Sequence, residues 1–327
     1  MLARRIQVAI LIASALLCLG ASICYIVQPD SCAVVTFWPA WAWAAAGVLM
    51  TLLAWNRRGK RGVMLVVLAW LIFACVFSEE PRSIFSLRHW PDPEWAASRQ
   101  EGKALRVVSL NCAVQTEAAA DEVIAYHPDI VLLQEAPNEQ YVNKLGRRLF
   151  GKSAAVVCRT DQAVIARGRV TASSSPRLIG LYAWARIRLA HGPEVAIFSV
   201  HLYPPVLRFD PWLPDCWKDY ALNRRLRRGE MKELADDINL ASGNLPVIVG
   251  GDFNAPGGDA VFGLMPPRLT DAFREASSGW PDTVINDFPV SRYDQIWLTR
   301  EFRPASPVVR KTLHSDHRMV ICDVVVR

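Results

Sequence analysis

Three long apolar stretches lie near the start of the chain and constrain its fold more than any other feature. They cover roughly Gln7 to Val27, Ala33 to Trp55 and Gly62 to Phe77. A helix needs about 20 apolar residues to cross the hydrocarbon core of a bilayer. The first two stretches reach that length, whereas the apolar part of the third is shorter. We therefore expect residues 1–77 to form an anchor of about three transmembrane helices. A signal peptide followed by a buried helical hairpin is the alternative, which is disfavoured because the first stretch lacks a clear small-residue cleavage site.

Basic residues near these stretches predict an orientation. Arg4 and Arg5 precede the first stretch, and the run Asn56 to Arg61 joins the second to the third, whereas residues 28–32 contain no Lys or Arg. The positive-inside rule places basic loops in the cytoplasm. Three spans then put the chain after Phe77 on the outer, periplasmic or extracellular side of the cell membrane. The side is reversed if the third stretch does not cross.

The rest of the chain differs in composition from the anchor. Residues 78–101 are rich in Pro, Trp and charged residues and are expected to be a linker at the membrane surface, where Trp is favoured. Residues 102–327 have a suitable length for one α/β domain. They contain 28 Lys plus Arg against 25 Asp plus Glu. This balance disfavours a strong nucleic-acid binder, which would concentrate basic residues in a patch.

Eight cysteines are present, without a CxxC pair or a His/Cys spacing typical of zinc sites. An outward-facing domain permits disulfides, whose pairing the sequence does not define. Cys112 and Cys322 lie in apolar strand patterns, so we expect both to be buried thiols.

Apolar strand patterns and helical patterns are mixed along residues 102–327. Strands are expected at 105–110, 130–133, 154–158, 162–166, 181–189 and 195–200, with later ones carrying Asp252, Asp294 and residues 319–326; helices are expected at 118–126, 141–150 and 220–240. Both alternating and continuously apolar strands occur. This mixture predicts a layered α/β fold with two stacked β-sheets and helices outside.

Polar residues recur where these apolar runs end. In the run Val247 to Pro256, Asp252 and Asn254 are two residues apart and would point the same way from a strand end. The other such positions are Asn111, Glu135, His201, Asp294 and the pair Asp316–His317. Each has an ordinary explanation alone, such as a helix terminus, a core histidine or a turn. Buried carboxylates are rare unless paired or metal-bound, so together they predict one site.

Six short motifs support this prediction. They are Leu110-Asn111, Leu132-Leu133-Gln134-Glu135, Val200-His201-Leu202, Gly251-Asp252-Phe253-Asn254, Tyr293-Asp294-Gln295-Ile296 and Ser315-Asp316-His317. In type and order they resemble the endonuclease/exonuclease/phosphatase superfamily, which includes pancreatic-type DNase, neutral sphingomyelinases and inositol-polyphosphate phosphatases. The resemblance covers most of residues 105–327, and the whole chain resembles membrane-anchored bacterial members. It implies a four-layer sandwich, two β-sheets flanked by helices, and metal-dependent phosphoester hydrolysis.

The resemblance also implies a metal site. Glu135 is expected to be the principal Mg²⁺ ligand with Asn111 beside it, and Asp316 to bind the metal or orient the site. Hard oxygen ligands suit Mg²⁺, which keeps several waters and contacts substrate phosphate. Mn²⁺ and Ca²⁺ are the alternatives.

Catalytic roles are implied for five further residues. Asp252 would position or deprotonate the attacking water, and Asn254 and His201 would hold phosphate oxygens. His317 would face the scissile phosphate, with Asp294 on its other ring nitrogen favouring the imidazolium. The general base is left open between Asp252 and His317.

Two departures from the superfamily pattern stand out. No confident second acidic position lies between Glu135 and His201, so His201 is expected to lack a carboxylate partner. Residues 203–219 form a loop rich in Pro and Trp, interpreted either as a self-packed surface loop or as a lid or lipid-facing edge.

The basic cluster at residues 224–228 is expected to be a solvated helix face.

The sequence thus predicts a membrane-anchored, divalent-metal-dependent phosphoester hydrolase, most simply a phosphodiesterase. Its substrate is left open among nucleic acid, phospholipid and small phosphate esters, and no protein partner is implied. The alternative is a catalytically retired binding scaffold of the same fold. A transporter is disfavoured because the apolar stretches contain no acidic or basic residue marking an ion path.

Overall fold

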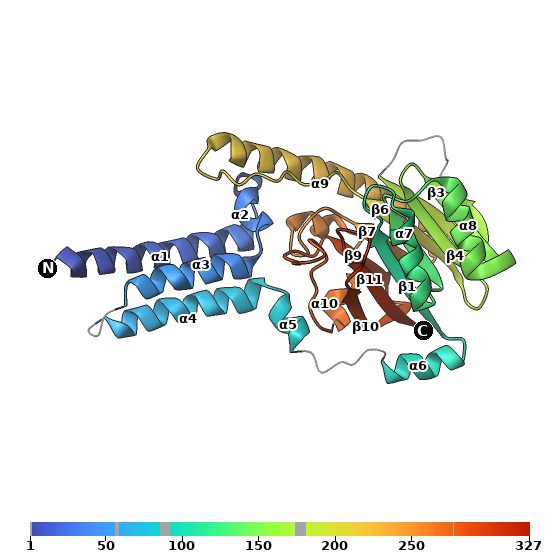
Figure 1. The fold of residues 1–327 in the computed structure, drawn as a ribbon, viewed down its shortest axis with the longest axis horizontal. Coiled ribbons are helices and arrows are strands. Elements are labelled where there is room, and N and C mark those ends of the chain that lie inside the picture. Colours follow the sequence, from blue (N-terminus) through green and yellow to red (C-terminus); the bar gives the residue numbers. More distant parts are fainter. Residues whose placement is uncertain (1, 56–58, 86–91, 174–180, 277) are drawn as a thin grey trace. The chain divides into compact units, whose positions relative to one another are not determined.

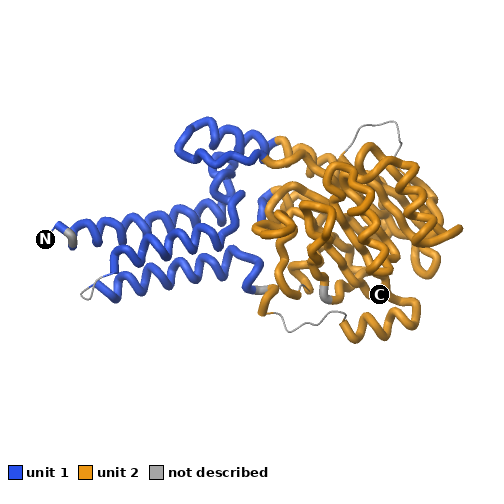
Figure 2. Tube along the Cα trace, in the orientation of Figure 1, with its two compact units in different colours: residues 1–82, 206–225, 258–260 blue, residues 83–205, 226–257, 261–327 orange. Residues whose placement is uncertain are grey.

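Interleaved parts of the chain form two structural units (Figure 2). The structure is a computed structural model that describes residues 2–55, 59–85, 92–173, 181–276 and 278–327. Unit 1 comprises residues 1–82, 206–225 and 258–260, and unit 2 comprises residues 83–205, 226–257 and 261–327. The N-terminal helices therefore share a unit with two short segments from far along the chain.

Unit 1 contains the apolar helices. In chain order they are α1 Leu2–Val27, η1 Asp30–Cys32, α2 Ala33–Phe37, α3 Ala40–Leu53 and α4 Lys60–Phe77, and α5 Glu80–Ile84 follows at the boundary with unit 2. By length and composition, α1 and α4 can each cross a membrane. The apolar stretch that was shortest in the sequence is thus a continuous helix of 18 residues.

The second apolar stretch, expected to be a span from Ala33 to Trp55, is not one continuous helix. It breaks into α2 and α3, which are bent by 77° and can count as one span only together. Trp38 and Pro39 lie at the break in extended conformation. Proline lacks an amide hydrogen and pushes the preceding residue out of the helical region, so the helix ends before Pro39 and restarts after it.

Small residues and aromatic rings hold these helices together. Cys18 and Ala21 of α1, Ala44 of α3, and Trp70 and Phe73 of α4 belong to one buried cluster. Small side chains let helix backbones approach closely, which increases the van der Waals contact between the helices.

Unit 2 is built on one hydrogen-bonded sheet. Its strands are β1 Ala104–Asn111, β2 Ile130–Gln134, β3 Ala154–Arg159, β4 Gln162–Ser173, β5 Tyr182–Leu189, β6 Glu194–His201, β7 Val247–Asp252, β8 Leu269–Asp271, β9 Asp294–Thr299, β10 Phe302–Arg310 and β11 Met319–Val326. The order is β10-β11-β1-β2-β4-β5-β6-β7-β9-β8, and β3 also pairs with β4. Most of these strands are labelled in Figure 1. The expected α/β fold is confirmed. The two expected sheets are joined into one, because the long strand β4 pairs with β2 near its start and with β5 near its end.

The two halves of the sheet share a core. Val107 and Leu132 from one half and Ile197, Ile248 and Ile296 from the other belong to one buried cluster. Side chains alternate between the faces of a strand. Positions 109 and 111 therefore share the inner face of β1 with Val107, and position 252 shares the inner face of β7 with Ile248.

Helices cover the opposite faces. They are α6 Pro93–Gln100, α7 Glu117–Asp121, η2 Glu122–Tyr126, α8 Glu139–Phe150, η3 Gly151–Ser153, α9 Pro214–Ser242 and η4 Ala260–Leu264. The short helix α10 Ala272–Ala276 instead packs Phe273 into the core between the two halves of the sheet. Leu234 and Ile238 of α9 pack with Phe198 of β6, while Leu145 of α8 packs with Leu133 of β2. The helix expected over residues 220–240 starts earlier, at Pro214, because proline is well suited to the first helical turn.

Two expectations about Trp and Cys residues can be compared with the structure. Trp95, expected in a surface linker, is buried and its indole nitrogen donates to Leu105 O at 3.1 Å. Trp90, in the same predicted linker, lies outside the described residues. Cys112 and Cys322 are buried thiols as expected, and all eight cysteines, each within the described ranges, are free.

Candidate functional site

Strand register brings three of the predicted site residues into one row. His201, at the end of β6, pairs with Asp252, at the end of the parallel strand β7. Asp252 in turn pairs with Asp294, the first residue of the antiparallel strand β9. Residues opposite each other on neighbouring strands point to the same face. Each of these residues is an even number of positions from a core residue of its own strand, Ile197, Ile248 or Ile296, so it points to the same face. The row therefore lies at one end of the inner face.

The other half of the sheet contributes from β1 and β2. Asn111 ends β1 and is paired with Gln134, after which Glu135 leaves β2. A polar layer lies beneath them, where Gln134 Nε2 donates to Ser199 Oγ at 2.9 Å. The inner faces therefore change from apolar to polar toward the strand ends that bear the site.

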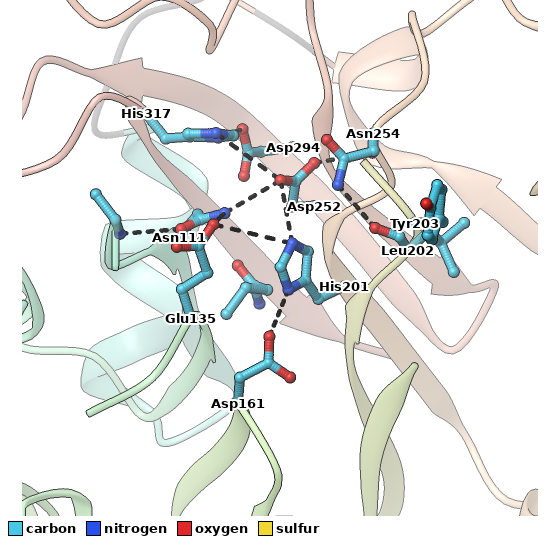
Figure 3. A network of polar contacts seen from close by, with 12 residues as sticks. Asn111, Glu135, Asp161, His201, Leu202, Tyr203, Asp252, Asn254, Asp294 and His317 are labelled. Atoms are coloured by element: carbon cyan, nitrogen blue, oxygen red, sulfur yellow. Dashed lines mark hydrogen bonds and ion pairs between the residues drawn. The ribbon is translucent and has the colours of Figure 1, made fainter. Parts of the chain in front are cut away.

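Asp252 is the centre of the site (Figure 3). Its Oδ2 atom accepts a hydrogen bond from Asn111 Nδ2 at 3.1 Å and lies 3.8 Å from His317 Nε2 and 4.0 Å from His201 Nε2. Its Oδ1 atom accepts from the backbone N–H of Asn254 at 2.8 Å. The side chain is only 2% exposed. One buried carboxylate is thus shared by an amide and two imidazole rings.

Each imidazole has its own carboxylate on the far ring nitrogen. His317 Nδ1 lies 2.9 Å from Asp294 Oδ2, as the sequence predicted. His201 Nδ1 lies 2.7 Å from Asp161 Oδ2, which the sequence analysis did not predict. A carboxylate on Nδ1 holds the proton there and orients Nε2 toward the opposite side. Both Nε2 atoms consequently face Asp252.

The expectation that His201 lacks a carboxylate partner is therefore wrong. Asp161 lies in the tight turn between β3 and β4, next to Thr160, whose φ is +51°. Its backbone carbonyl accepts from Ala136 N at 2.8 Å, which fixes the turn beside Glu135. The available signal was an Asp in a short polar interruption between two apolar strands, which is also typical of an ordinary hairpin turn.

Glu135 occupies a strained position opposite Asp252. Its φ is +45°, in the left-handed region that residues other than glycine rarely adopt. One carboxylate oxygen accepts from Val114 N at 2.6 Å and the other from Asn111 Nδ2 at 3.1 Å. The Asn111 amide thereby bridges Glu135 and Asp252, while its own oxygen accepts from Ala113 N at 3.0 Å.

Asn254 is buried beside Asp252, and its amide group is partly committed. Its Nδ2 donates to Leu202 O at 2.8 Å, and its φ is +50°. An amide nitrogen carries two hydrogens, so one more donor is available for a ligand. The Gly251 that precedes Asp252 has a φ of +145°, and a Cβ atom there would lie 2.0 Å from Val200 O. Glycine is therefore required for the strand end that presents Asp252.

Asp316 is exposed, and its backbone oxygen accepts from Asn286 N at 2.7 Å. Its charge adds to those of Asp294 and Asp252, which raise the pKa of His317 against the effect of burial. Its neighbour Ser315 supports the site, because its hydroxyl donates to Asn111 O at 2.7 Å.

The buried ion pairs shift the protonation of the site. Burial opposes the charged form of His317, but the Asp294 and Asp252 carboxylates outweigh it and raise the pKa of His317 to about 10. For His201, burial is likewise outweighed by Asp161 and other carboxylates, so the pKa of His201 is raised. Burial raises the pKa of Asp252, against the opposing effect of His317. The site therefore favours two imidazolium rings around a carboxylate that takes up protons readily.

The residues present fit a divalent cation. The carboxylates of Glu135, Asp161, Asp252 and Asp294 outnumber the two imidazoles, and Asp294 Oδ1 is buried without a hydrogen-bond partner among the described residues. Ligand atoms of Asp252, Asp294 and His317 lie within 4.8 Å of one another. Excess negative charge and an unpaired buried oxygen are costly unless a cation compensates them.

Comparison with known proteins agrees with this architecture. Residues 108–317 match the model of the Endonuclease/Exonuclease/phosphatase family, so the chain belongs to that family. Members of the family are hydrolases that act on phosphate esters. No curated protein matches the sequence.

Solved structures show the same fold at low sequence identity. A family member from Bacteroides thetaiotaomicron is 15% identical, with a TM-score of 0.55 over 68% of this chain and 98% of that chain. A mannosyl-6-phosphatase from the same organism is 15% identical, with a TM-score of 0.53 over 68% and 99%. Truncated TDP2 from Caenorhabditis elegans is 15% identical, with a TM-score of 0.52 over 69% and 99%.

Proposed function

We propose that the chain is a membrane-anchored, metal-dependent phosphodiesterase whose residues direct a water molecule at phosphorus. The observation that carries this proposal is the position of Asp252 between the rings of His201 and His317, each backed by its own carboxylate. A carboxylate flanked by two imidazolium donors can orient a nucleophile and stabilise a negatively charged phosphoryl group at the same place.

Each residue has a role that follows from its contacts. Asp252 accepts a proton from the attacking water, because it is buried and has a raised pKa. The Nε2 atoms of His317 and His201 donate hydrogen bonds to phosphate oxygens, where positive charge opposes the charge that develops during attack. The remaining amide hydrogen of Asn254 supports a further phosphate oxygen.

A divalent cation would be held by Glu135, whose side chain is 32% exposed and leaves room for the waters that Mg²⁺ retains. Asn111 would join through Oδ1, which has a second lone pair beside its bond from Ala113. The buried group of Asp252, Asp294 and His317 suits Mg²⁺ less, because it includes a ring nitrogen and excludes water. When bound, the metal would neutralise charge on a phosphate oxygen.

The surplus of carboxylates favours diesters over monoesters. A diester carries one negative charge at neutral pH, whereas a monoester carries nearly two, and like charges repel in a buried site. One of the similar structures is a mannosyl-6-phosphatase, so monoesters belong among the compounds tested.

Contacts between the N-terminal helices support the proposed anchor. Tyr25 of α1 donates to Trp38 O, and Gln7 of α1 donates to Trp55 O, so the chain from Trp38 to Trp55 runs back along α1. The distance from Gln7 to Tyr25 is about 27 Å at the helical rise, close to the thickness of a bilayer core.

The helix α4 then runs forward again. The position of a Cβ on Gly62 lies 3.1 Å from Leu11, near the start of α1, and Phe77 contacts Tyr25, near its end, with ring centroids 5.4 Å apart. Three passes, with the basic residues around residue 60 on the cytoplasmic side, support the proposal that the catalytic domain lies outside the cytoplasm.

The test is hydrolysis of bis(p-nitrophenyl) phosphate by the full chain purified in detergent. We expect activity with Mg²⁺ and loss with EDTA, and a decrease of about 10²- to 10⁴-fold in Asp252→Ala and His317→Ala. Glu135→Ala should lose activity at ordinary Mg²⁺ concentration and regain part of it at higher Mg²⁺ concentration. Arg300→Ala, at a side chain 91% exposed, is the control. Full activity in EDTA or in Asp252→Ala would overturn the mechanism, and parallel assays on nucleic acid, phospholipid and sugar phosphate would identify the substrate class.

A further inference from the structure

Residues 206–217 present an unusual set of exposed apolar side chains. Leu207, Phe209 and Trp212 are 64%, 69% and 77% exposed, and Leu213 and Trp217 are also exposed. A water-facing loop rarely places so many large apolar groups together, and contiguous exposed apolar surface usually marks a binding face. We call residues 206–217 the aromatic segment.

The aromatic segment belongs to the same unit as the apolar helices and packs near one end of them. Phe209 contacts Trp38 with ring centroids 5.4 Å apart. Tyr220 lies further along α9, the helix that begins within the segment at Pro214, and contacts Phe37 with ring centroids 5.1 Å apart. Trp38 lies in the turn between α2 and α3, beside the C-terminal end of α1. The segment therefore lies at the level where α1 ends.

Exposed apolar surface continues from that end of α1. Ile26 and Val27, the last two residues of α1, are 71% and 64% exposed. In a helix that crosses a bilayer, such side chains face lipid. The aromatic segment extends this surface at the boundary between the hydrocarbon core and the headgroups, where Trp is preferred.

The charges of the aromatic segment are neutralised within its own neighbourhood. Arg208 forms ion pairs with Asp210 and Asp219, and Lys218 pairs with Asp215 at 2.9 Å. The indole nitrogen of Trp217 donates to Pro211 O at 2.7 Å. Paired charges and satisfied donors lower the cost of entering a region of low dielectric. They also leave no excess positive charge to attract anionic lipid.

A buried polar cluster holds this part of the chain in place. Arg224 forms an ion pair with Asp259 at 3.1 Å, donates to Thr36, and lies 3.4 Å from Gln28 O. The side chain of Gln28 bonds Gly258 O at 2.7 Å. The expectation that Arg224 lies on a solvated helix face is therefore wrong, because its side chain is 2% exposed. The cluster ties the helix after the aromatic segment to the turn that follows α1.

From these contacts we propose that the aromatic segment inserts into the interfacial layer of a phospholipid bilayer, beside the point where α1 leaves it. The insertion depends on apolar burial and not on anionic lipid. This inference rests on the proposed membrane anchor, but it is independent of the proposed phosphodiesterase chemistry. It assigns the lipid surface as the partner of this face, in preference to a second protein or another copy of the chain.

The test uses the full chain labelled with 5-fluorotryptophan in lipid nanodiscs, with ¹⁹F resonances assigned by single Trp→Phe variants. A phosphatidylcholine spin-labelled near the top of its acyl chain should broaden the Trp212 resonance severalfold. Trp184, which lies on β5 of unit 2 and is partly buried against Phe198, is the control and should change little. Broadening of Trp212 should persist at high salt and when part of the lipid is replaced by phosphatidylglycerol.

Other results would overturn the inference. Broadening of Trp212 by a water-soluble gadolinium chelate and not by the lipid label would show a water-facing loop. Broadening that requires phosphatidylglycerol and low salt would show electrostatic attachment. Protection from both agents would show coverage by protein.

Trp55 separates failure of this inference from failure of the anchor. It lies just after α3, which ends at Leu53, and is 53% exposed. Lipid contact at Trp55 without contact at Trp212 would reject the aromatic segment alone, whereas absence of lipid contact at both would reject the anchor as well.

Discussion

His317 Nδ1 lies 2.9 Å from Asp294 Oδ2, and the two side chains are 10% and 0% exposed. The bond fixes the imidazole ring so that Nε2 faces Asp252 at 3.8 Å. Because the pair is buried, the charge of the carboxylate acts on the ring with little screening by water. The pKa of His317 is consequently raised to about 10, despite the opposing effect of burial.

This relationship predicts the pH dependence of the proposed hydrolysis. Activity needs Asp252 ionised and both imidazoles protonated, so it falls at low pH as Asp252 takes up a proton and at high pH as the first imidazole loses one. The acid limb should lie above the ordinary pKa of Asp, 3.8, because burial raises that of Asp252. The alkaline limb should lie above the ordinary pKa of His, 6.5, because the pKa values of His201 and His317 are both raised, and no higher than the value of about 10 for His317. In Asp294→Asn the alkaline limb should move to lower pH, as measured from kcat/KM against pH.

A matched control exists outside the site. His314 Nδ1 lies 3.0 Å from Glu122 Oε1 in a pair whose histidine side chain is 49% exposed and whose glutamate side chain is 17% exposed. Glu122→Gln should leave both limbs in place. An alkaline limb that is the same in Asp294→Asn as in the original chain would contradict the assigned role of His317.

The second pair, Asp161 with His201, should also matter for catalysis. Asp161→Asn removes the charge that favours the protonated ring of His201, so we expect kcat to fall by about 10²-fold. In the His201→Gln background the same substitution should have little further effect, because the two residues act as a unit. Steady-state kinetics of the two single variants and the double variant measure this coupling. Fully additive losses would show that Asp161 acts elsewhere.

The contrast between Asp294 and Asp161 shows how far the sequence could predict the site. Asp294 lies within one of the six motifs and begins β9, so the apolar strand pattern and the family resemblance both indicated it. Asp161 lies in a hairpin turn, and the pairing of β4 with β2, in which Gln162 lies opposite Gln134, brings that turn beside Glu135 and His201. Such long-range placement depends on tertiary packing, and local residue preferences do not encode it. Asp316, which its motif indicated, is exposed, and its role as a metal ligand stays a prediction.

Gly251 offers a test of the strand end itself. Gly251→Ala puts a Cβ atom 2.0 Å from Val200 O at a φ of +145°, so the backbone that presents Asp252 must shift. We expect lower stability and a strong loss of activity. The control is Gly229→Ala in α9, where a Cβ meets nothing within 4 Å and alanine is favoured in a helix by about 1 kcal/mol. Thermal unfolding should therefore show lower stability for Gly251→Ala and higher stability for Gly229→Ala, and only Gly251→Ala should lose hydrolysis. Unchanged activity in Gly251→Ala would refute the requirement for glycine at this position.

Pro39 and Arg224 illustrate two other limits of sequence interpretation. Hydropathy over residues 33–55 indicated one span, but the helix is broken at Pro39. A hydropathy average takes no account of the backbone N–H that proline lacks. Four arginines within residues 224–228 suggested a solvated face. A buried arginine is rare unless paired, and its partner Asp259 is 35 positions away in the chain.

Arg224 and Asp259 should therefore show strong energetic coupling. Their side chains are each 2% exposed and 3.1 Å apart, so Arg224→Gln removes the guanidinium from a buried carboxylate and should cost about 3–5 kcal/mol. The double variant Arg224→Gln with Asp259→Asn should cost less than the sum of the single variants, because it also removes the charge left behind. Arg225→Gln, at the exposed neighbouring position, should change stability by no more than about 0.5 kcal/mol. Reversible unfolding of the full chain in detergent measures all four, and a coupling energy near zero would show that the ion pair does not stabilise unit 1.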